Sequence, residues 1–369
     1  MADTGSGDLL KLPLNELHEA AKARFGGFAG WNMPITYPLG VLKEHLHTRE
    51  KAGLFDISHM KLIEVSGGEA AKALARACPF DPEALALGQS KYTFLLNEKA
   101  GISDDVIVTR VAETRFIVVA NAGNAAADVA HLSAVAAEFN CVVDPLDRVL
   151  FALQGPAAEA ALTEAGLDLS HLTFMQGVEP KTGWFATRSG YTGEDGFEIA
   201  MPIPEAREFA DKLLANENVA WVGLAARDSL RLEAGLCLHG NDITPDTNPV
   251  EAGLMWAIAK PLRETGTFIG ADALRAAISQ GAARKRVGLK PEGRAPVRDG
   301  TPLIDADGKT VGEVTSGGFG PSVGHPVAMG YVDTEPAQPA TEVFAEVRGN
   351  RVRLAVHPLP FTPHRYRKG

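Results

Sequence analysis

The chain has 369 residues, 45% of them hydrophobic and 22% charged, which is ordinary for a globular protein and more than one typical domain requires. Lys and Arg number 36 against 46 Asp and Glu, and the net charge of −10 argues against a surface that neutralises nucleic-acid phosphates. No apolar run approaches the length of a membrane span, so we expect neither a nucleic-acid nor a membrane partner.

The cysteines and the first residues bear on the compartment. Cys78, Cys141 and Cys237 are far apart and odd in number, which fits neither a disulfide framework nor a zinc ribbon. Residues 1–10 contain neither a basic segment before an apolar run nor an Arg-rich presequence. We therefore expect a cytoplasmic protein; a mitochondrial-matrix protein without its leader would look the same.

The first part of the chain predicts an α+β module. Helical spacing runs from Leu14 to Phe25, and the glycines and prolines from Gly26 to Pro38 predict an irregular loop after it. Helices are also predicted over residues 41–52, 68–77 and 125–139, and strands over 63–66, 92–96, 106–111 and 116–120. Strands and helices in this mixed order are typical of the α+β class.

A second unit begins near residue 149, and the pattern changes again near Val287. Strands are predicted over residues 149–153, 184–187 and 197–200, and helices over 157–165, 205–215 and within 267–283. After Val287, short apolar alternations at 310–314, 328–332 and 352–356 are separated by Gly, Pro and Asp turns. Such closely spaced short strands predict a small β barrel or sandwich.

A glycine-rich turn and a later Arg carry the first chemical signal. In the segment Ser189–Gly196, three glycines permit backbone angles that place Tyr191 and Glu194 on a rigid turn. A carboxylate there can accept hydrogen bonds from an amino-substituted heterocycle, Tyr191 can cover its face, and Arg227 can hold an anionic tail. These groups predict a folate-like ligand.

Each of these residues also has a structural interpretation. Glu194 alone is typical of a surface turn, and Tyr191 is equally suited to anchoring the turn through its hydroxyl. Arg227 and Arg231 share a helix face, where either can pair with a nearby acid.

Two other clusters invite chemical interpretations. Asp104 and Asp105 precede the apolar strand predicted from residue 106, and an isolated pair of this kind is more often a solvated turn. His45, His47 and His59 form the densest histidine group, but positions i and i+2 of a helix point to different sides, and no HExxH or Cys/His set accompanies them. We expect no metal site.

These stretches together resemble the aminomethyltransferases, the T-protein of the glycine cleavage system. The segments that carry the resemblance follow the family's order from about Phe28 to Tyr366: residues 28–34, 42–45, 53–60, 92–97, 104–108, 153–156, 189–196, 226–242 and 248–253. Each segment alone is a weak signal, and together they cover nearly the whole chain.

The resemblance implies an α+β fold of three domains in a clover-leaf arrangement around a folate cavity, with a C-terminal β-barrel domain. It implies a folate-binding α+β domain split between residues 1–52 and 143–260, a second α+β domain of residues 53–142, and a barrel domain of residues 284–369. Periodicity on its own supports only the change from α+β to β structure near Val287.

The resemblance also implies an activity, that of a tetrahydrofolate-dependent aminomethyltransferase in glycine catabolism and one-carbon metabolism. Such an enzyme takes the aminomethyl group from the lipoylated carrier H-protein, transfers its methylene to tetrahydrofolate to give 5,10-methylenetetrahydrofolate, and releases ammonia. Tetrahydrofolate is then a co-substrate, and a carboxylate beside the methylene stabilises the positive charge that develops there. The chemistry needs no metal.

Carried over residue by residue, the family's catalytic aspartate falls on Asp104, with Asp105 as its structural neighbour. The positions predicted to contact folate are Glu194, Arg227, Tyr366, Tyr92, Asn121 and Tyr191. Many relatives have two tyrosines near the C-terminus, whereas here Arg367 follows Tyr366.

Two related functions compete with this interpretation. A folate-dependent demethylase of small methylated compounds is disfavoured by the retained acidic pair and by the nearly unbroken motifs. A folate-binding maintenance factor for iron–sulfur assembly would carry a Lys-Gly-Cys motif, and none of the three cysteines follows Lys-Gly.

Overall fold

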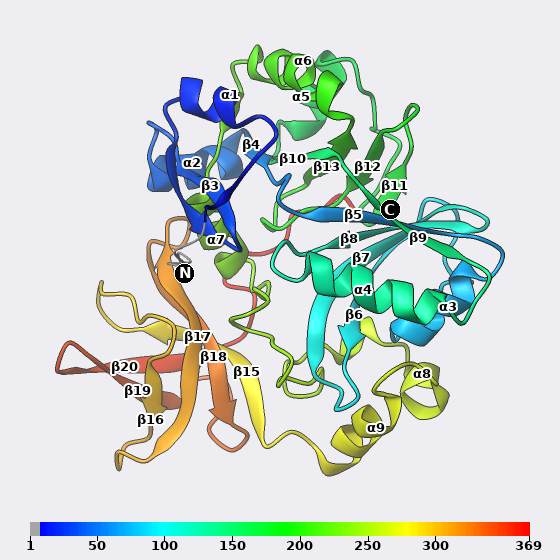
Figure 1. Cartoon of the computed structure of the whole chain (residues 1–369). Helices are drawn as coiled ribbons and strands as arrows, with labels where there is room; N and C mark the ends of the chain where they lie inside the picture. Colours follow the sequence, from blue (N-terminus) through cyan, green and yellow to red (C-terminus); the bar gives the residue numbers. More distant parts are fainter. Residues whose placement is uncertain (1–7) are drawn as a thin grey trace.

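The computed structural model describes residues 8–369 and has the α+β architecture with a closed C-terminal barrel that the sequence predicts. Figure 1 shows a helix-covered sheet at the top, a second sheet on the right and the barrel at the lower left, grouped around the centre of the molecule. The expected clover-leaf arrangement is confirmed. Across residues 8–369, no helix combines the length and apolar character needed to cross a membrane.

The N-terminal segment differs from its prediction. It contains β1 (Leu10–Lys11), the short helix α1 (Asn15–Ala20), β2 (Arg24–Phe28) and β3 (Trp31–Thr36), with strand order β1-β3-β2. The prediction of a helix that reaches Phe25, followed by an irregular loop over residues 26–38, is therefore wrong.

A tight turn and close packing explain why a hairpin forms there. Ala29 and Gly30 have φ values of 50° and 79°, the positive angles of two-residue turns whose twist matches that of the flanking strands. Gly26 suggests a loop in the sequence but lies in β2, where a Cβ atom would come within 2.9 Å of the Ile35 side chain. The hairpin brings Phe28 to the central cavity.

The upper sheet has the order β11-β12-β13-β10-β4-β14. Its strands are β4 (Ala52–Asp56), β10 (Val149–Gln154), β11 (Gln176–Val178), β12 (Phe185–Arg188), β13 (Gly196–Met201) and β14 (Val219–Trp221). Four helices accompany it: α2 (Val41–Glu50), α5 (Ala158–Glu164), α6 (Ile203–Leu214) and α7 (Leu224–Glu233). Strand β10 lies between two partners and is buried along its whole length, which explains its apolar sequence from Val149 to Leu153.

The second sheet has the order β6-β7-β8-β5-β9. Its strands are β5 (Lys61–Ser66), β6 (Ser90–Leu96), β7 (Ile102–Ala112), β8 (Arg115–Ala120) and β9 (Val142–Leu146), with helices α3 (Ala70–Ala77) and α4 (Ala125–Ala136). In β7, Val106 and Val108 pack into the core that includes α3 and α4, whereas Asp105 and Ile107 line the cavity. The alternation of side chains along β7 therefore separates the core from the site.

A helical connection leads into the barrel. It contains the 3₁₀ helix η1 (Met255–Ala257), α8 (Lys260–Thr265) and α9 (Ala271–Gln280). The barrel closes in the order β15-β18-β17-β16-β19-β20, which selects a barrel over a sandwich. Its strands are β15 (Arg284–Pro291), β16 (Pro302–Ile304), β17 (Thr310–Gly320), β18 (His325–Asp333), β19 (Glu342–Val347) and β20 (Asn350–His357).

The division into domains remains a proposal. Sheet membership changes between Asp56 and Lys61, and it changes back between Leu146 and Val149. The predicted units, residues 1–52 with 143–260, residues 53–142 and residues 284–369, stay a prediction. By sheet membership, β4 goes with the first unit and β9 with the second.

A buried ionic cluster attaches the barrel to α7. The Glu233 carboxylate lies 3.2 Å from the Arg49 guanidinium and 3.2 Å from His45 Nε2, and it accepts the backbone N–H of Ser322 at 2.8 Å. Burial raises the pKa of Glu233, but His45, Ser322 and Arg49 outweigh it and bring the pKa down to about 2.

We expect Glu233→Gln to lower the free energy of unfolding by about 3 kcal/mol at neutral pH, because the buried Arg49 guanidinium loses a counter-charge. The pKa of Glu233 is depressed, so its stabilisation is present above the unfolded value of 4.5 and is lost as the pH falls toward about 2. Urea unfolding of parent and variant between about pH 5 and pH 3 measures this linkage. A stability difference that did not shrink with falling pH would contradict the assignment.

Candidate functional site

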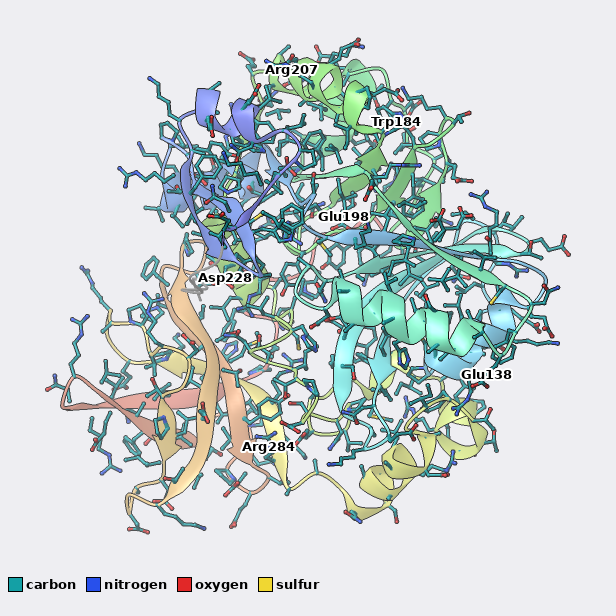
Figure 2. All side chains as sticks on the ribbon, viewed as in Figure 1. Glu138, Trp184, Glu198, Arg207, Asp228 and Arg284 are labelled. Carbon is teal, nitrogen blue, oxygen red and sulfur yellow. The ribbon has the colours of Figure 1, made fainter. Side chains whose placement is uncertain are left out.

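A cavity of about 1250 Å³ lies where the two sheets and the barrel meet. Its size is above the range of roughly 300–1000 Å³ usual for single-ligand pockets, so it has room for a large substrate and a second reacting group. Figure 2 shows Glu198, one of its lining residues, near the centre of the molecule and Arg207 at the outer edge. The polar and aromatic lining residues used below are His59, Tyr92, Asp105, Asn121, Asn124, Phe174, Tyr191, Glu198, Arg227, Arg231, His239, Trp256 and Tyr366.

Strand β7 carries the acidic pair on opposite faces, because successive side chains of a strand alternate. Asp105 lines the cavity, whereas Asp104 is fully buried behind it. The pair therefore lies inside β7, which begins at Ile102, and the prediction that it lies at the entrance of a strand beginning at Val106 is wrong.

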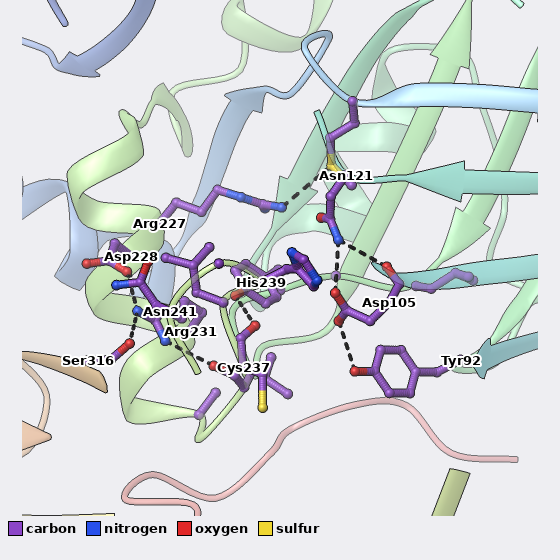
Figure 3. A pocket seen from close by; sticks show the side chains of 18 of the residues that line it. Tyr92, Asp105, Asn121, Arg227, Asp228, Arg231, Cys237, His239, Asn241 and Ser316 are labelled. Carbon is purple, nitrogen blue, oxygen red and sulfur yellow. Dashed lines mark hydrogen bonds and ion pairs between the residues drawn. The ribbon is translucent and has the colours of Figure 1, made fainter. Parts of the chain in front are cut away.

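Two side chains hold the Asp105 carboxylate. The Tyr92 hydroxyl donates to Oδ2 at 2.9 Å, and the Asn121 amide donates to Oδ1 at 2.9 Å, as the dashed lines of Figure 3 show. Burial raises the pKa of Asp105 to about 6, with the charge of Asp104 as the second cause. A carboxyl group that titrates near neutral pH and faces a cavity can exchange a proton with a bound substrate.

Asp104 is surrounded by hydrogen-bond donors. Its Oδ1 accepts from Asn121 Nδ2 at 2.9 Å and from Asn124 Nδ2 at 2.7 Å, and its Oδ2 accepts from the Asn121 backbone N–H at 3.1 Å. Burial and contact with Asp104 raise the pKa of Asp128 on α4 to about 9. The geometry of Asp104 favours a role in positioning, while the catalytic role predicted for it remains a prediction.

Arg227, on α7, is a buried guanidinium with an unused donor. Its guanidinium carbon lies 4.8 Å from the centroid of the Tyr191 ring, and its Nη2 lies 4.0 Å from the Met60 sulfur. Its Nη1 has no hydrogen-bond partner within residues 8–369, and burial lowers the pKa of Arg227. Buried donors are normally satisfied, so this one is suited to an acceptor group of a ligand.

The two interpretations of Tyr191 are compatible in the structure. Its hydroxyl donates to the backbone carbonyl of Cys237, which anchors the glycine-rich turn. Its ring at the same time lines the cavity beneath Arg227.

The glutamate that lines the cavity is Glu198 in β13, and Glu194 lies behind the wall. Glu194 is buried and pairs with Arg49 at 3.0 Å and with Arg365 at 3.1 Å. Glu198 accepts a hydrogen bond from Ser189 Oγ at 2.7 Å and lies at the cavity surface. The geometry favours Glu198 for contact with a ligand, and the folate contact predicted for Glu194 remains a prediction.

Stacked aromatic pairs give the cavity flat walls. Tyr366, in the C-terminal segment, stacks on Phe174 with ring centroids 3.9 Å apart. Tyr92 stacks on Trp256 of η1 with centroids 5.5 Å apart, and Trp256 is 64% exposed. Such surfaces suit a planar heterocycle.

The histidine group predicted not to bind metal is dispersed in the fold. His45 and His47 lie on α2 and bond to different partners, Ser229 and the Asn218 carbonyl. Of these three histidines, only His59 lines the cavity. Burial, followed by the charge of Arg227, lowers the pKa of His59 to about 3 and keeps its imidazole neutral. From residue 8 onward, no group of three or more His, Cys, Asp or Glu side chains is arranged to hold a metal ion.

The structure brings most of the predicted site residues together. Five line the cavity: Tyr92, Asn121, Tyr191, Arg227 and Tyr366. Two are buried behind it: Asp104 and Glu194. Their roles toward a ligand remain predictions.

Sequence reasoning missed three further polar residues of this wall. Glu198 carried a usable signal, since it is the one charged residue of the otherwise apolar strand β13. His239 and Asn124 are hydrogen-bonded to each other although 115 positions separate them. His239 follows α7 and Asn124 precedes α4, so their pairing depends on how these distant segments pack. No local sequence pattern indicates it.

Family models match both parts of the chain. The GCVT N-terminal domain matches residues 14–261, and the glycine cleavage T-protein C-terminal barrel domain matches residues 284–362. The mitochondrial aminomethyltransferase of Gallus gallus is 42% identical over 97% of this chain and 94% of its own length. That of Dictyostelium discoideum is 39% identical over 99% of this chain and 95% of its own length.

A solved structure of the same family is similar to this chain at higher sequence identity. The glycine cleavage system aminomethyltransferase T from Bartonella henselae is 61% identical, and the two structures superpose with a TM-score of 0.97 over 98% of this chain and 100% of the other. Sequence and fold agree along almost the whole length. The chain belongs to the glycine cleavage T-protein family of aminomethyltransferases.

Proposed function

We propose that this aminomethyltransferase takes an aminomethyl group from the lipoyl arm of the carrier H-protein of the glycine cleavage system and transfers its methylene to tetrahydrofolate. The observation that carries the proposal is the cavity, which Arg227, Glu198, stacked aromatic walls and Asp105 line together. Nη1 of Arg227 has no hydrogen-bond partner among residues 8–369. Family membership supports the class of enzyme, and the chemistry of the cavity supports folate as the acceptor.

In the proposed reaction, bonds from the methylene to sulfur and to nitrogen break, and two bonds to folate nitrogens form. The carrier's S–CH₂–NH₂ group yields a thiol and ammonia, while the CH₂ joins N5 and N10 of tetrahydrofolate. The two protons that leave N5 and N10 go to the ammonia and to the thiol, so atoms and electrons balance without a redox step. The enzyme has to align the substrates, stabilise the positive charge on the methylene and relay these protons.

We assign contact with the reacting atoms to Asp105. Its carboxylate faces the cavity, and its pKa of about 6 lets it accept a proton from a folate nitrogen and release it to the leaving group. Asp104 then acts from behind, by holding Asn121, which donates to both acids.

We assign the polar edge of the pterin to Glu198 and Arg227. A carboxylate matches the adjacent N–H groups of an aminopyrimidinone ring, and the free guanidinium donor matches its carbonyl oxygen. Both side chains line the same cavity, and Glu198 is one of the charges that act on Arg227. Tyr366 and Phe174 offer a stacking surface for the rest of the ligand.

Glu198→Gln is expected to raise the KM for tetrahydrofolate by about tenfold to a hundredfold, the value of one lost charge-assisted hydrogen bond. Glu194→Gln is the matched control, because it changes a neighbouring acid that is paired with Arg49 and Arg365. The control should lower thermal stability and leave the KM within about threefold of the parent value. Weaker folate binding in Glu194→Gln alone would restore the assignment that the sequence implies.

The function is tested by mixing the purified protein with aminomethyl-lipoyl H-protein and tetrahydrofolate, and by measuring ammonia and 5,10-methylenetetrahydrofolate. We expect equal amounts of the two products, with neither formed at a comparable rate when the carrier lacks lipoyl or folate is omitted. Tight folate binding without either product would contradict the proposal and favour a demethylase or a maintenance factor.

We further propose a reducing compartment, the cytoplasm or the mitochondrial matrix. The curated relatives above are mitochondrial forms. Cys78, Cys141 and Cys237 are free thiols in the structure, which supports a reducing environment.

A further inference from the structure

The loop after α7 brings a histidine to the buried acidic pair. The side chain of His239 is 9% exposed, and its Nδ1 lies 4.0 Å from Asp104 Oδ1. The loop is held in place from within, because the Leu238 backbone N–H donates to the Asp242 carboxylate at 2.9 Å. His239 therefore reaches the acids from a fixed backbone.

Asp242 ties this loop to both α7 and the barrel. Its fully buried carboxylate lies 2.7 Å from Arg231 on α7 and accepts from Ser316 Oγ of β17 at 2.9 Å. The Tyr331 hydroxyl of β18 donates to the Asp242 backbone carbonyl at 2.7 Å. Figure 3 shows His239 between Arg231 on one side and Asp105 on the other.

The hydrogen-bond partners of His239 define its tautomer. Its Nε2 lies 3.0 Å from the carbonyl oxygen of Ile102, which can only accept, so Nε2 carries a hydrogen. Its Nδ1 lies 2.9 Å from Asn124 Nδ2, and the same Nδ2 lies 2.7 Å from Asp104 Oδ1. A neutral imidazole with its lone pair on Nδ1 gives both amide hydrogens of Asn124 an acceptor.

This arrangement fixes the orientation of the Asn124 amide. If Nδ1 of His239 carried a hydrogen, Asn124 would have to turn its oxygen toward it, and that oxygen would then face the Asp104 carboxylate. Two oxygen acceptors in contact repel each other. The neutral imidazole and the amide orientation therefore support each other.

Asn121 carries the constraint from Asp104 to Asp105. Its backbone N–H and side-chain amide both donate to Asp104, at 3.1 and 2.9 Å, and the same amide donates to Asp105 Oδ1 at 2.9 Å. A continuous chain of hydrogen bonds thus runs from His239 through Asn124, Asp104 and Asn121 to Asp105.

We propose that His239 is a positioning residue of this enzyme, which orients Asn124 and through it fixes Asp104, Asn121 and the cavity-facing carboxylate of Asp105. The proposal rests on the proposed function, because it gives Asp105 contact with the substrates. His239 does not relay protons itself in this role, since its Nε2–H is bound to a backbone carbonyl.

The acidic cluster around Asp104, which His239 approaches, comes from two elements. Asp104 and Asp105 lie on β7, and Asp128 lies on α4; Tyr92 of β6 bonds to Asp105 from the other side. Arg286 of β15 is the basic residue whose charge acts on Tyr92. The hydrogen bond from Asn121 is among the interactions that lower the pKa of Asp105 against the raising effects of burial and Asp104. Loss of His239 releases Asn124 and loosens Asn121, so it is expected to raise the pKa of Asp105.

The test compares His239→Phe with His239→Gln in the complete assay with aminomethyl-lipoyl H-protein and tetrahydrofolate. Phe keeps a ring and removes both hydrogen bonds, whereas Gln keeps one donor and one acceptor. We expect His239→Phe to lower kcat by about tenfold with the KM for tetrahydrofolate within about twofold, and to move the acid limb of the kcat profile to higher pH. His239→Gln should retain most of the parent kcat and its pH profile.

Asn124→Ala provides an independent variant of the same chain and should change kcat and the acid limb in the same direction as His239→Phe. The proposal would be overturned if His239→Phe and Asn124→Ala had the kcat and the acid limb of the parent. It would also be overturned if His239→Gln were as impaired as His239→Phe while thermal unfolding showed both to be equally well folded. If the parent itself formed neither product, the proposed function would fail and this proposal with it. Turnover by the parent with unaffected variants would overturn this proposal alone.

Discussion

Asp105→Asn is expected to lower kcat by about a thousandfold while the dissociation constant for tetrahydrofolate stays within about twofold of the parent value. An amide neither accepts the proton from a folate nitrogen nor stabilises the positive charge on the methylene. The side chain keeps its shape, and Tyr92 and Asn121 remain beside it. Steady-state ammonia release and a fluorescence titration with tetrahydrofolate measure the two quantities.

Asp104→Asn is the matched control one residue away. Its new NH₂ group would face the donors of Asn121 and Asn124, so we expect the free energy of unfolding to fall by about 2 kcal/mol. Asp105→Asn should instead gain stability at pH 7, since the folded-state pKa of Asp105 is raised to about 6 and its charge opposes folding above the unfolded value of 3.8. A normal kcat in Asp105→Asn, with a well-folded and inactive Asp104→Asn, would return the catalytic role to Asp104.

Arg227→Leu is expected to weaken tetrahydrofolate binding by about a hundredfold and to raise the free energy of unfolding by about 1–2 kcal/mol. Nη1 of this buried guanidinium has no partner within residues 8–369, so its charge opposes folding of the free protein. The same nitrogen can donate to a bound ligand, so its removal stabilises the fold and weakens binding. Isothermal titration with tetrahydrofolate and urea unfolding of the free protein give the two values.

Arg231→Leu provides the contrast on the same face of α7. Arg231 pairs with Asp242 at 2.7 Å and with Asp228, also at 2.7 Å, so its removal leaves the fully buried Asp242 carboxylate without its counter-charge. We expect Arg231→Leu to lose about 3 kcal/mol of stability. Equal losses of stability in the two variants would show that Arg227 is a structural cation.

Elements whose signal is local could be predicted from the sequence. Helix α2 and strand β8 follow from their own residues, and the closely spaced turns after Val287 indicate the barrel. The β2–β3 hairpin could not be predicted, because its glycines suggest a loop. The close packing of Gly26 against Ile35, which explains a glycine in β2, is visible only in the folded protein.

The segments that form the cavity could be predicted, but which of their side chains face it could not. Resemblance indicated the acidic pair and the glycine-rich turn, but which acid faces the cavity depends on strand alternation and on the true start of β7 at Ile102. Glu194 faces Arg49 and Arg365, whereas Glu198 faces the cavity. Contacts between distant segments, such as His239 with Asn124, left no local pattern in the sequence.

The most direct test of the whole account is a crystal structure of the protein with tetrahydrofolate bound. We expect the polar edge of the pterin at Glu198 and Arg227, with N5 and N10 turned toward the Asp105 carboxylate. Folate bound outside this cavity, or bound in it with N5 and N10 out of reach of Asp105, would contradict the account.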